Sequence, residues 1–189
     1  MYQGKHFKLG MAGAAIAASM LLWAPIAGAD TADGTVGATS TGTVDLSILV
    51  PNLVMITGLD AIELEYEAGN DVVGVENFCV WATAGTEYTI QITSANGSGV
   101  FEAIGAATSS SIDYTVDFDD DTSVEAWQPV TEGVVLGGSG YTTASNGARP
   151  GCVGGDNAAI RITAVEADNL DGAAADDYQD ELTLLVTAI

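Results

Sequence analysis

Apolar and polar residues alternate with a period of two along most of this chain. In the stretch Thr41–Val50, four aliphatic residues fall on one side, and threonine, aspartate and serine fall on the other. A period of two is typical of a β-strand with one apolar face. The same alternation recurs in the stretches 62–66, 88–93, 112–118, 158–164 and 178–189. Beyond residue 29 no window shows a convincing helical period, so the sequence predicts an all-β fold.

Short apolar runs and turn residues complete this pattern. Further strands are expected where such runs occur, at 53–56, 77–81, 124–130 and 134–136. Turns rich in glycine, asparagine and aspartate separate the runs, and Gly137-Gly138 is expected to end one strand. So many short strands favour a β-sandwich. Because we find no internal repeat and no linker, we expect a single sandwich domain at 51–189.

The first 29 residues have the pattern of a cleaved signal peptide. Lys5, His6 and Lys8 form a basic start, residues 9–23 are apolar, and Ala27-Gly28-Ala29 is a small-residue cleavage site. The alternative is an anchor that stays on the chain. No later run approaches the roughly 20 apolar residues that a membrane-spanning helix needs. We therefore expect an exported protein that starts at Asp30 and is not inserted in a membrane after cleavage.

The expected mature chain is strongly acidic. All 26 acidic residues lie beyond residue 29, with only Arg149 and Arg161 as basic residues, so its formal charge is −24. Such a surface repels nucleic acid and anionic membranes, which excludes them as partners. It suits a protein that stays soluble in a salty medium or one that binds cations.

The same composition argues against an enzyme. No histidine and no lysine remain beyond residue 29. A Ser–His or Cys–His nucleophile, a Schiff-base lysine and a phosphate-binding loop are therefore all absent from the mature sequence. Pairs of carboxylates occur by chance among so many acids and carry little weight.

Cys79 and Cys152 are the two cysteines of the chain. An even number of cysteines in an exported protein indicates a disulfide. Because no histidine lies nearby, a metal site built on these thiols is the weaker interpretation.

Two acidic clusters offer candidate calcium ligands. Asp117, Asp119 and Asp121 have a spacing that brings three carboxylates together where a strand turns into a loop. A second acidic loop contains Asp168, Asp171, Asp176 and Asp177. Neither has an EF-hand pattern. We therefore expect solvated acidic surfaces and no cofactor, with calcium as the alternative.

Aromatic residues on the predicted strands allow two interpretations. They are a sugar-binding platform or they are core residues: Trp81, Tyr88, Tyr114, Trp127 and Tyr178. Their alternating positions favour the core. Arg161 lies in the middle of a predicted strand, and we expect it to pair with a carboxylate.

The two ends of the mature chain resemble a known family. Residues 41–48 are similar to the N-terminal segment of pilus subunits of the archaic and alternate chaperone–usher type, which include spore coat U-like domains. Residues 174–186, with Tyr178-Gln179-Asp180 before an alternating strand, are similar to the closing signature of that family. The stretches 78–80 and 88–90 resemble its cysteine-containing strand and the strand after it.

The chain departs from the family at two places. Many relatives carry a cysteine just after the first strand, where this chain has Pro51-Asn52-Leu53-Val54. Cys79 therefore has only Cys152 to pair with. Asp176-Asp177 also replaces the glycine that usually precedes the closing tyrosine.

The resemblance implies an immunoglobulin-like sandwich that is one strand short. A neighbouring subunit completes it by donor-strand exchange, a form of strand addition, and the subunits form a head-to-tail fibre. A periplasmic chaperone and an outer-membrane usher assist the assembly. The product is an extracellular, cell-surface fimbrium that serves adhesion and biofilm formation.

The resemblance also implies roles for particular residues. The arm 30–50 carries the donor strand, with four residues that insert into a neighbour: Val44, Leu46, Ile48 and Val50. The last strand forms one wall of the acceptor groove, with four residues on its inner face: Tyr178, Leu182, Leu184 and Val186. Asp180 falls on the same inner face.

Two other functions compete with this one. The first is a self-complete, secreted acidic β-sandwich, a surface or matrix protein that binds calcium. In that case Thr41–Val50 belongs to its own sheet. The second is a carbohydrate-binding adhesin, although tip adhesins usually have a second domain.

Overall fold

The computed structural model of the chain describes residues 32–145, 151–165 and 170–189. The predicted signal peptide, Arg149 and Asp168 lie outside these residues. The chain divides into two units, Met1–Leu49 and Val50–Ile189, each of which is considered by itself. Among the residues described, no helix has the length and hydropathy required to cross a membrane.

In the first unit, the described arm doubles back on itself. Ala32 and Thr43 form an isolated antiparallel bridge, with backbone hydrogen bonds of 3.0 and 3.3 Å. The residues after Thr43 belong to no strand in the described structure, and their side chains are exposed.

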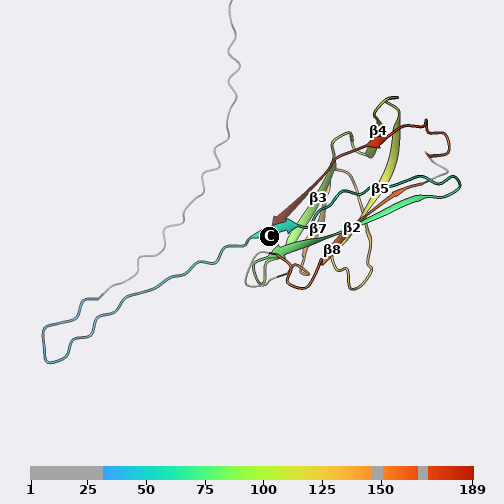
Figure 1. Cartoon of the computed structure of the whole chain (residues 1–189). Helices are drawn as coiled ribbons and strands as arrows, with labels where there is room; N and C mark the ends of the chain where they lie inside the picture. The colour runs from blue at the N-terminus through green and yellow to red at the C-terminus, as the bar shows by residue number, and fades with distance from the viewer. Residues whose placement is uncertain (1–31, 146–150, 166–169) are drawn as a thin grey trace, which may run out of the picture. The chain divides into compact units, whose positions relative to one another are not determined.

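The second unit consists of antiparallel strands. They are β1 (Val54–Thr57), β2 (Val72–Ala82), β3 (Tyr88–Ser94), β4 (Phe101–Gly105), β5 (Ser111–Asp119), β6 (Gln128–Val130), β7 (Val135–Tyr141), β8 (Ala158–Ala164), β9 (Tyr178–Gln179) and β10 (Leu182–Ala188). The larger sheet has the order β1-β2-β8-β5-β4-β9, with β6 also paired to β5, and the smaller sheet has the order β10-β3-β7. Figure 1 shows β2, β8 and β5 side by side. The predicted all-β sandwich is confirmed, and it is consistent with an immunoglobulin-like architecture.

The core lies between the inner faces of the two sheets. Even-numbered residues of β2 and β3 point inward, and Phe78, Val80, Tyr88 and Ile92 are fully buried. Phe118 of β5 contacts both Phe78 and Tyr141, with ring centroids 6.3 and 5.2 Å apart. The period of two in the sequence therefore sorts these strands into a buried and an exposed face. Of the aromatic residues considered for a sugar platform, Tyr88 is in this core.

Between residues 62 and 141, several strand predictions differ in kind or length from the structure. The stretch 62–66 alternates but is not a strand, and 124–130 is reduced to β6. The strand predicted to stop at Gly137 continues to Tyr141. Glycine is needed at position 137, because the Tyr141 ring occupies the space where a side chain would lie. Gly137 also has a φ of 83°, which glycine adopts without strain.

The predicted final strand, 178–189, is in fact two strands in different sheets. β9 pairs with β4 in the larger sheet, whereas β10 pairs with β3 in the smaller one. Asp180 and Glu181 form the crossing between them. Local alternation cannot reveal this break, because it does not depend on which sheet a strand joins.

Cys79 and Cys152 form the expected disulfide, with 5.7 Å between their Cα atoms. It joins the buried end of β2 to the segment before β8. Asn157 strengthens the same junction, because its side chain accepts from Val80 N at 2.8 Å and donates to Thr143 O at 2.8 Å. The long connection between β7 and β8 is thereby attached to the core.

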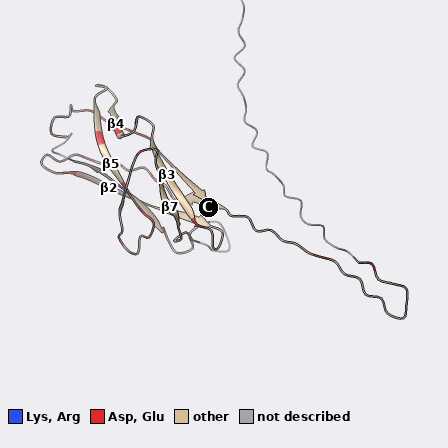
Figure 2. Cartoon of the chain, turned by 180° about the vertical axis from the view of Figure 1, so that it is seen from behind, with Lys and Arg blue, Asp and Glu red and all other residues tan. Residues whose placement is uncertain are grey.

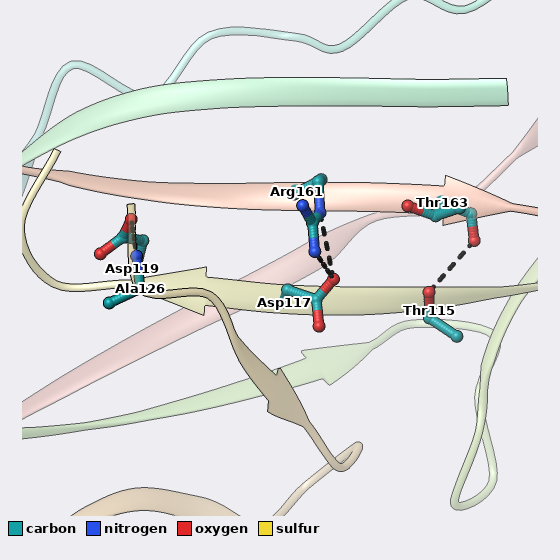
Figure 3. Close-up of polar contacts among 6 residues, drawn as sticks. All are labelled: Thr115, Asp117, Asp119, Ala126, Arg161 and Thr163. Atoms are coloured by element: carbon teal, nitrogen blue, oxygen red, sulfur yellow. Dashed lines mark hydrogen bonds and ion pairs between the residues drawn. The ribbon is translucent and has the colours of Figure 1, made fainter. Parts of the chain in front are cut away.

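The outer face of the larger sheet carries the expected ion pair. Arg161 of β8 donates from Nη2 to Asp117 of β5 at 2.8 Å (Figure 3). Its guanidinium lies 4.7 Å from the centre of the Trp127 ring. The same two strands are joined by Thr115 Oγ1, which donates to Thr163 O at 3.3 Å. Figure 2 shows acidic residues in red on β5 and at other places along the chain.

We predict that replacing both cysteines with serine lowers the free energy of unfolding by about 4 kcal/mol, because the disulfide closes a long loop in the unfolded chain. The measurement is urea denaturation with and without dithiothreitol. The reductant is expected to destabilise the unmodified protein and to leave the double variant unchanged. Equal stability of the two proteins without reductant contradicts the prediction.

Candidate functional site: an apolar groove beside a free strand edge

The strand β10 has a free edge in the described structure, because it pairs only with β3. Ala95 N donates to Glu181 O, and Ile189 N donates to Glu87 O, both at 2.9 Å. Odd-numbered residues of β10 therefore bond toward β3. In an antiparallel ladder the alternate residues direct their N–H and C=O groups to the opposite side. Four even-numbered residues thus present backbone donors and acceptors at the free edge: Leu182, Leu184, Val186 and Ala188.

The same even-numbered residues turn their side chains inward. Leu182, Leu184 and Val186 pack against the core, whereas Leu185 is 53% exposed on the outer face. An incoming strand that bonds to this edge would therefore place its own alternate side chains against the core. This coupling follows from the pleat of a β-sheet.

A groove of about 580 Å³ lies beside this edge. Most of its lining is apolar and comes from both sheets and from the segment after β1: Leu59, Ile62, Leu64, Val72, Ile112, Tyr114, Ile160, Ile162, Leu170, Tyr178, Leu182 and Leu184. Acidic residues also line it: Asp60, Glu76, Asp176, Asp177, Asp180 and Glu181. The groove suits an extended apolar segment better than an acidic ligand.

A second part of the groove lining is the segment Leu59–Tyr66, which we call the flanking segment. Its alternation places Ile62, Leu64 and Tyr66 in the groove lining. Asp60 N donates to the Glu76 carboxylate at 2.8 Å. Within the described chain, the backbone of residues 62–66 has no hydrogen-bonded partner. The segment has the alternating sequence of a strand, but among the described residues it forms no hydrogen-bonded ladder with another strand.

Asp180 fixes the crossing between the sheets at one end of the groove. Its carboxylate accepts from Ser94 Oγ of β3 at 2.6 Å and from the Tyr114 hydroxyl of β5. Burial, and next the bond to Asp180, raise the pKa of Tyr114 above its ordinary value. An acid on the inner face is therefore satisfied by one hydroxyl from each sheet.

Asp176 closes the turn between β4 and β5 next to the groove. Its carboxylate accepts from Thr108 Oγ1 at 2.6 Å, from Thr108 N at 2.7 Å and from Ala107 N at 3.0 Å. The Thr108 hydroxyl, and then its N–H, lower the pKa of Asp176 from 3.8 to about 2. Asp176 thus has hydrogen-bond partners in the turn between β4 and β5.

The structure brings three of the four predicted acceptor residues into the groove. Tyr178, Leu182 and Leu184 line it, whereas Val186 packs on the core beyond it. Tyr178 belongs to β9 and donates to Ala174 O at 3.0 Å, so it is not on the same strand as the others. Sequence reasoning missed the contribution of Ile160 and Ile162, whose alternation predicted a buried face but not the cavity beside it.

The four predicted donor residues are exposed in the described chain. The exposed fractions of Val44, Leu46, Ile48 and Val50 are 81, 83, 78 and 68%. Exposure of consecutive alternate aliphatic residues costs free energy in water, at about 25 cal/mol per Å² of apolar surface. Such a surface is typical of an interaction site.

The candidate calcium ligands do not converge. Asp117 pairs with Arg161, and the buried Asp119 accepts from Asp121 N and Ala126 N at 3.1 Å (Figure 3). Asp121 accepts from the Ser123 hydroxyl at 2.5 Å. In the part of the chain that is described, no three acidic, cysteine or histidine side chains are arranged to hold a metal ion.

Comparison with known proteins gives one structural likeness to report. No protein-family model matches the chain, and no curated protein does either. The chain is similar to part of a solved structure described as "Chaperone-tip adhesin complex is vital for synergistic activation of CFA/I fimbriae biogenesis". The identity is 14% and the TM-score is 0.49, over 71% of this chain and 41% of that one.

We predict a pH-dependent contribution of Asp176 to stability. Because its pKa is lower in the folded state, its contribution is complete above pH 3.8 and is lost as the pH falls toward 2. The melting temperature of Asp176→Asn should therefore lie below that of the unmodified protein at pH 6, and the difference should shrink toward pH 2 and vanish below it. Asp171→Asn, at an exposed position nearby, is the control. A difference that stays constant over this range contradicts the assignment.

Proposed function

We propose that this protein is a structural pilus subunit of the chaperone–usher type that polymerises by donor-strand exchange. One observation carries the proposal: the chain contains an exposed alternating segment, Thr41–Val50, and an apolar groove beside an unpaired strand edge. The segment could supply the apolar side chains that fill the groove and the backbone groups that pair with the free edge of β10. The proposal assigns no catalysis and no cofactor to the protein.

The two surfaces match in period. The donor segment carries four aliphatic residues at alternate positions, and β10 presents four alternate residues at its free edge. Paired in register, the donor residues would face the core while their backbone groups bond to β10. Each aliphatic side chain that becomes buried contributes about 1.5–3 kcal/mol. The only acid of the segment, Asp45, lies on the opposite face and brings no charge into the groove.

The flanking segment supplies a second edge. A strand inserted between β10 and residues 62–66 would find backbone partners on both sides. The alternation of the flanking segment, which has no strand partner in the described chain, supports this arrangement.

Chain length favours a donor from a second copy. Asn52 Nδ2 donates to Ile189 O at 3.4 Å, so Asn52 itself lies near the end of β10. In an antiparallel insertion Val50 would lie near Leu182. Along the strand, Leu182 lies about 24 Å from Ile189, and so from Asn52, at about 3.4 Å per residue. The two residues from Val50 to Asn52 span at most about 7 Å. The chain's own arm can thus enter only parallel to β10, whereas a neighbour's arm can form the more stable antiparallel pairing.

Each subunit would then fill the groove of the next, which gives an open head-to-tail fibre. An unfilled groove and a free edge promote aggregation, which is the reason for a chaperone partner before assembly. Export through the periplasm, handover at an outer-membrane usher and a place on the cell surface complete the proposal.

The decisive experiment separates donor from acceptor. Residues 30–189 with Leu46→Asp and Ile48→Asp serve as the acceptor, because a carboxylate in the groove costs about 3 kcal/mol or more, roughly 100-fold in affinity. This variant should remain unpolymerised and should bind a labelled peptide of residues 41–50, measured by fluorescence anisotropy. The control peptide carries Ser47→Asp on the outer face and should bind nearly as well. Failure of the acceptor to bind the unmodified peptide overturns the proposal.

A matched pair on β10 tests the groove itself. We predict that Leu184→Asp in the acceptor weakens peptide binding at least 100-fold, because its side chain lines the groove. Leu185→Asp, one residue along on the exposed outer face, should change binding less than threefold. Circular dichroism checks that both variants are folded. Equal effects of the two substitutions would place the peptide elsewhere.

A further inference from the structure

Gly74 lies on the inner face of β2, directly beneath the flanking segment. It is buried and pairs with Ile162 of β8. A Cβ atom at this position would lie 2.7 Å from Ile62 Cγ2 and 2.7 Å from Leu64 Cδ2. Its φ is outside the left-handed region, so the position requires space rather than a special backbone conformation.

Because Gly74 has no side chain, the side chains of Ile62 and Leu64 can lie close to the backbone of β2. Its described attachments are the bond from Asp60 N to Glu76 and the packing of Ile62 and Leu64 over Gly74. The same two side chains line the groove, as do Leu182 and Leu184 of β10. A side chain at position 74 would therefore displace the Ile62 and Leu64 side chains from the sheet, into the groove that they line.

We propose that Gly74 is a specificity-determining residue that sets the width of the groove for branched aliphatic donor side chains. This inference rests on the proposed function and deepens it. The absent side chain lets Ile62 and Leu64 sink into the sheet, which leaves room for residues of the size of valine, leucine and isoleucine. The donor segment carries only such residues on its apolar face.

The test uses the donor-disabled acceptor defined above and labelled peptides of residues 41–50. Gly74→Val should weaken binding of the unmodified peptide at least tenfold. It should weaken binding of an Ile48→Ala peptide much less, so that the ratio of the two affinities falls at least fivefold. Gly138→Val, which adds the same side chain at a strand glycine with open space around it, should leave both affinities unchanged.

Two further variants keep the inference testable if Gly74→Val folds poorly. Adding Leu64→Ala to Gly74→Val should return the lost volume and restore binding of the unmodified peptide to within threefold. Leu64→Ala alone should widen the groove and raise the affinity for an Ile48→Phe peptide at least tenfold.

The outcomes distinguish the two proposals. If the starting acceptor binds no peptide, the proposed function fails. If it binds but Leu64→Ala leaves the preference among the peptides unchanged, only the role of Gly74 and its partners is overturned. The same holds if a folded Gly74→Val variant keeps the original affinity ratio.

Discussion

Pairing of backbone polar groups along β10 is the constraint on which the rest of the site depends. β3 satisfies one edge of β10, and among the described residues no strand satisfies the other. Because side-chain direction and hydrogen-bond direction alternate together, the unpaired groups belong to the same residues that face the core. The open edge and the groove are therefore one feature, which we propose accepts a strand from a second copy of the chain.

Several polar contacts fix the positions of the residues around the groove. Asp180 accepts a hydrogen bond from one hydroxyl of each sheet, and Asp176 accepts from residues of the turn between β4 and β5. Glu76 accepts from Asp60 N of the flanking segment, and Ile62 and Leu64 of that segment pack over Gly74. In a chain with a formal charge of −22, these acids act mainly as acceptors for N–H and O–H groups. The one described ion pair, Arg161 with Asp117, lies on the outer face, away from the groove lining.

Much of the fold was predictable because strand faces are encoded locally. The bounds of β8 agree with the predicted 158–164, and β3 and β5 differ from their predictions by a residue or so. The disulfide was predictable because the chain has only two cysteines. Only part of the groove lining was predictable from the sequence. Leu182 and Leu184 follow from alternation and family resemblance, but Ile160, Ile162 and the flanking segment enter it through packing that no local pattern reports.

The sequence by itself determined which residues face inward and which segment, Thr41–Val50, is apolar on one side, because a period of two needs no knowledge of neighbours. Tertiary structure decided which strands have partners. It split 178–189 between two sheets at Asp180, and it left 62–66 without a ladder although its alternation equals that of a true strand. A segment forms a strand only where another strand pairs with its backbone N–H and C=O groups. This pairing depends on contacts between residues that are far apart in the chain.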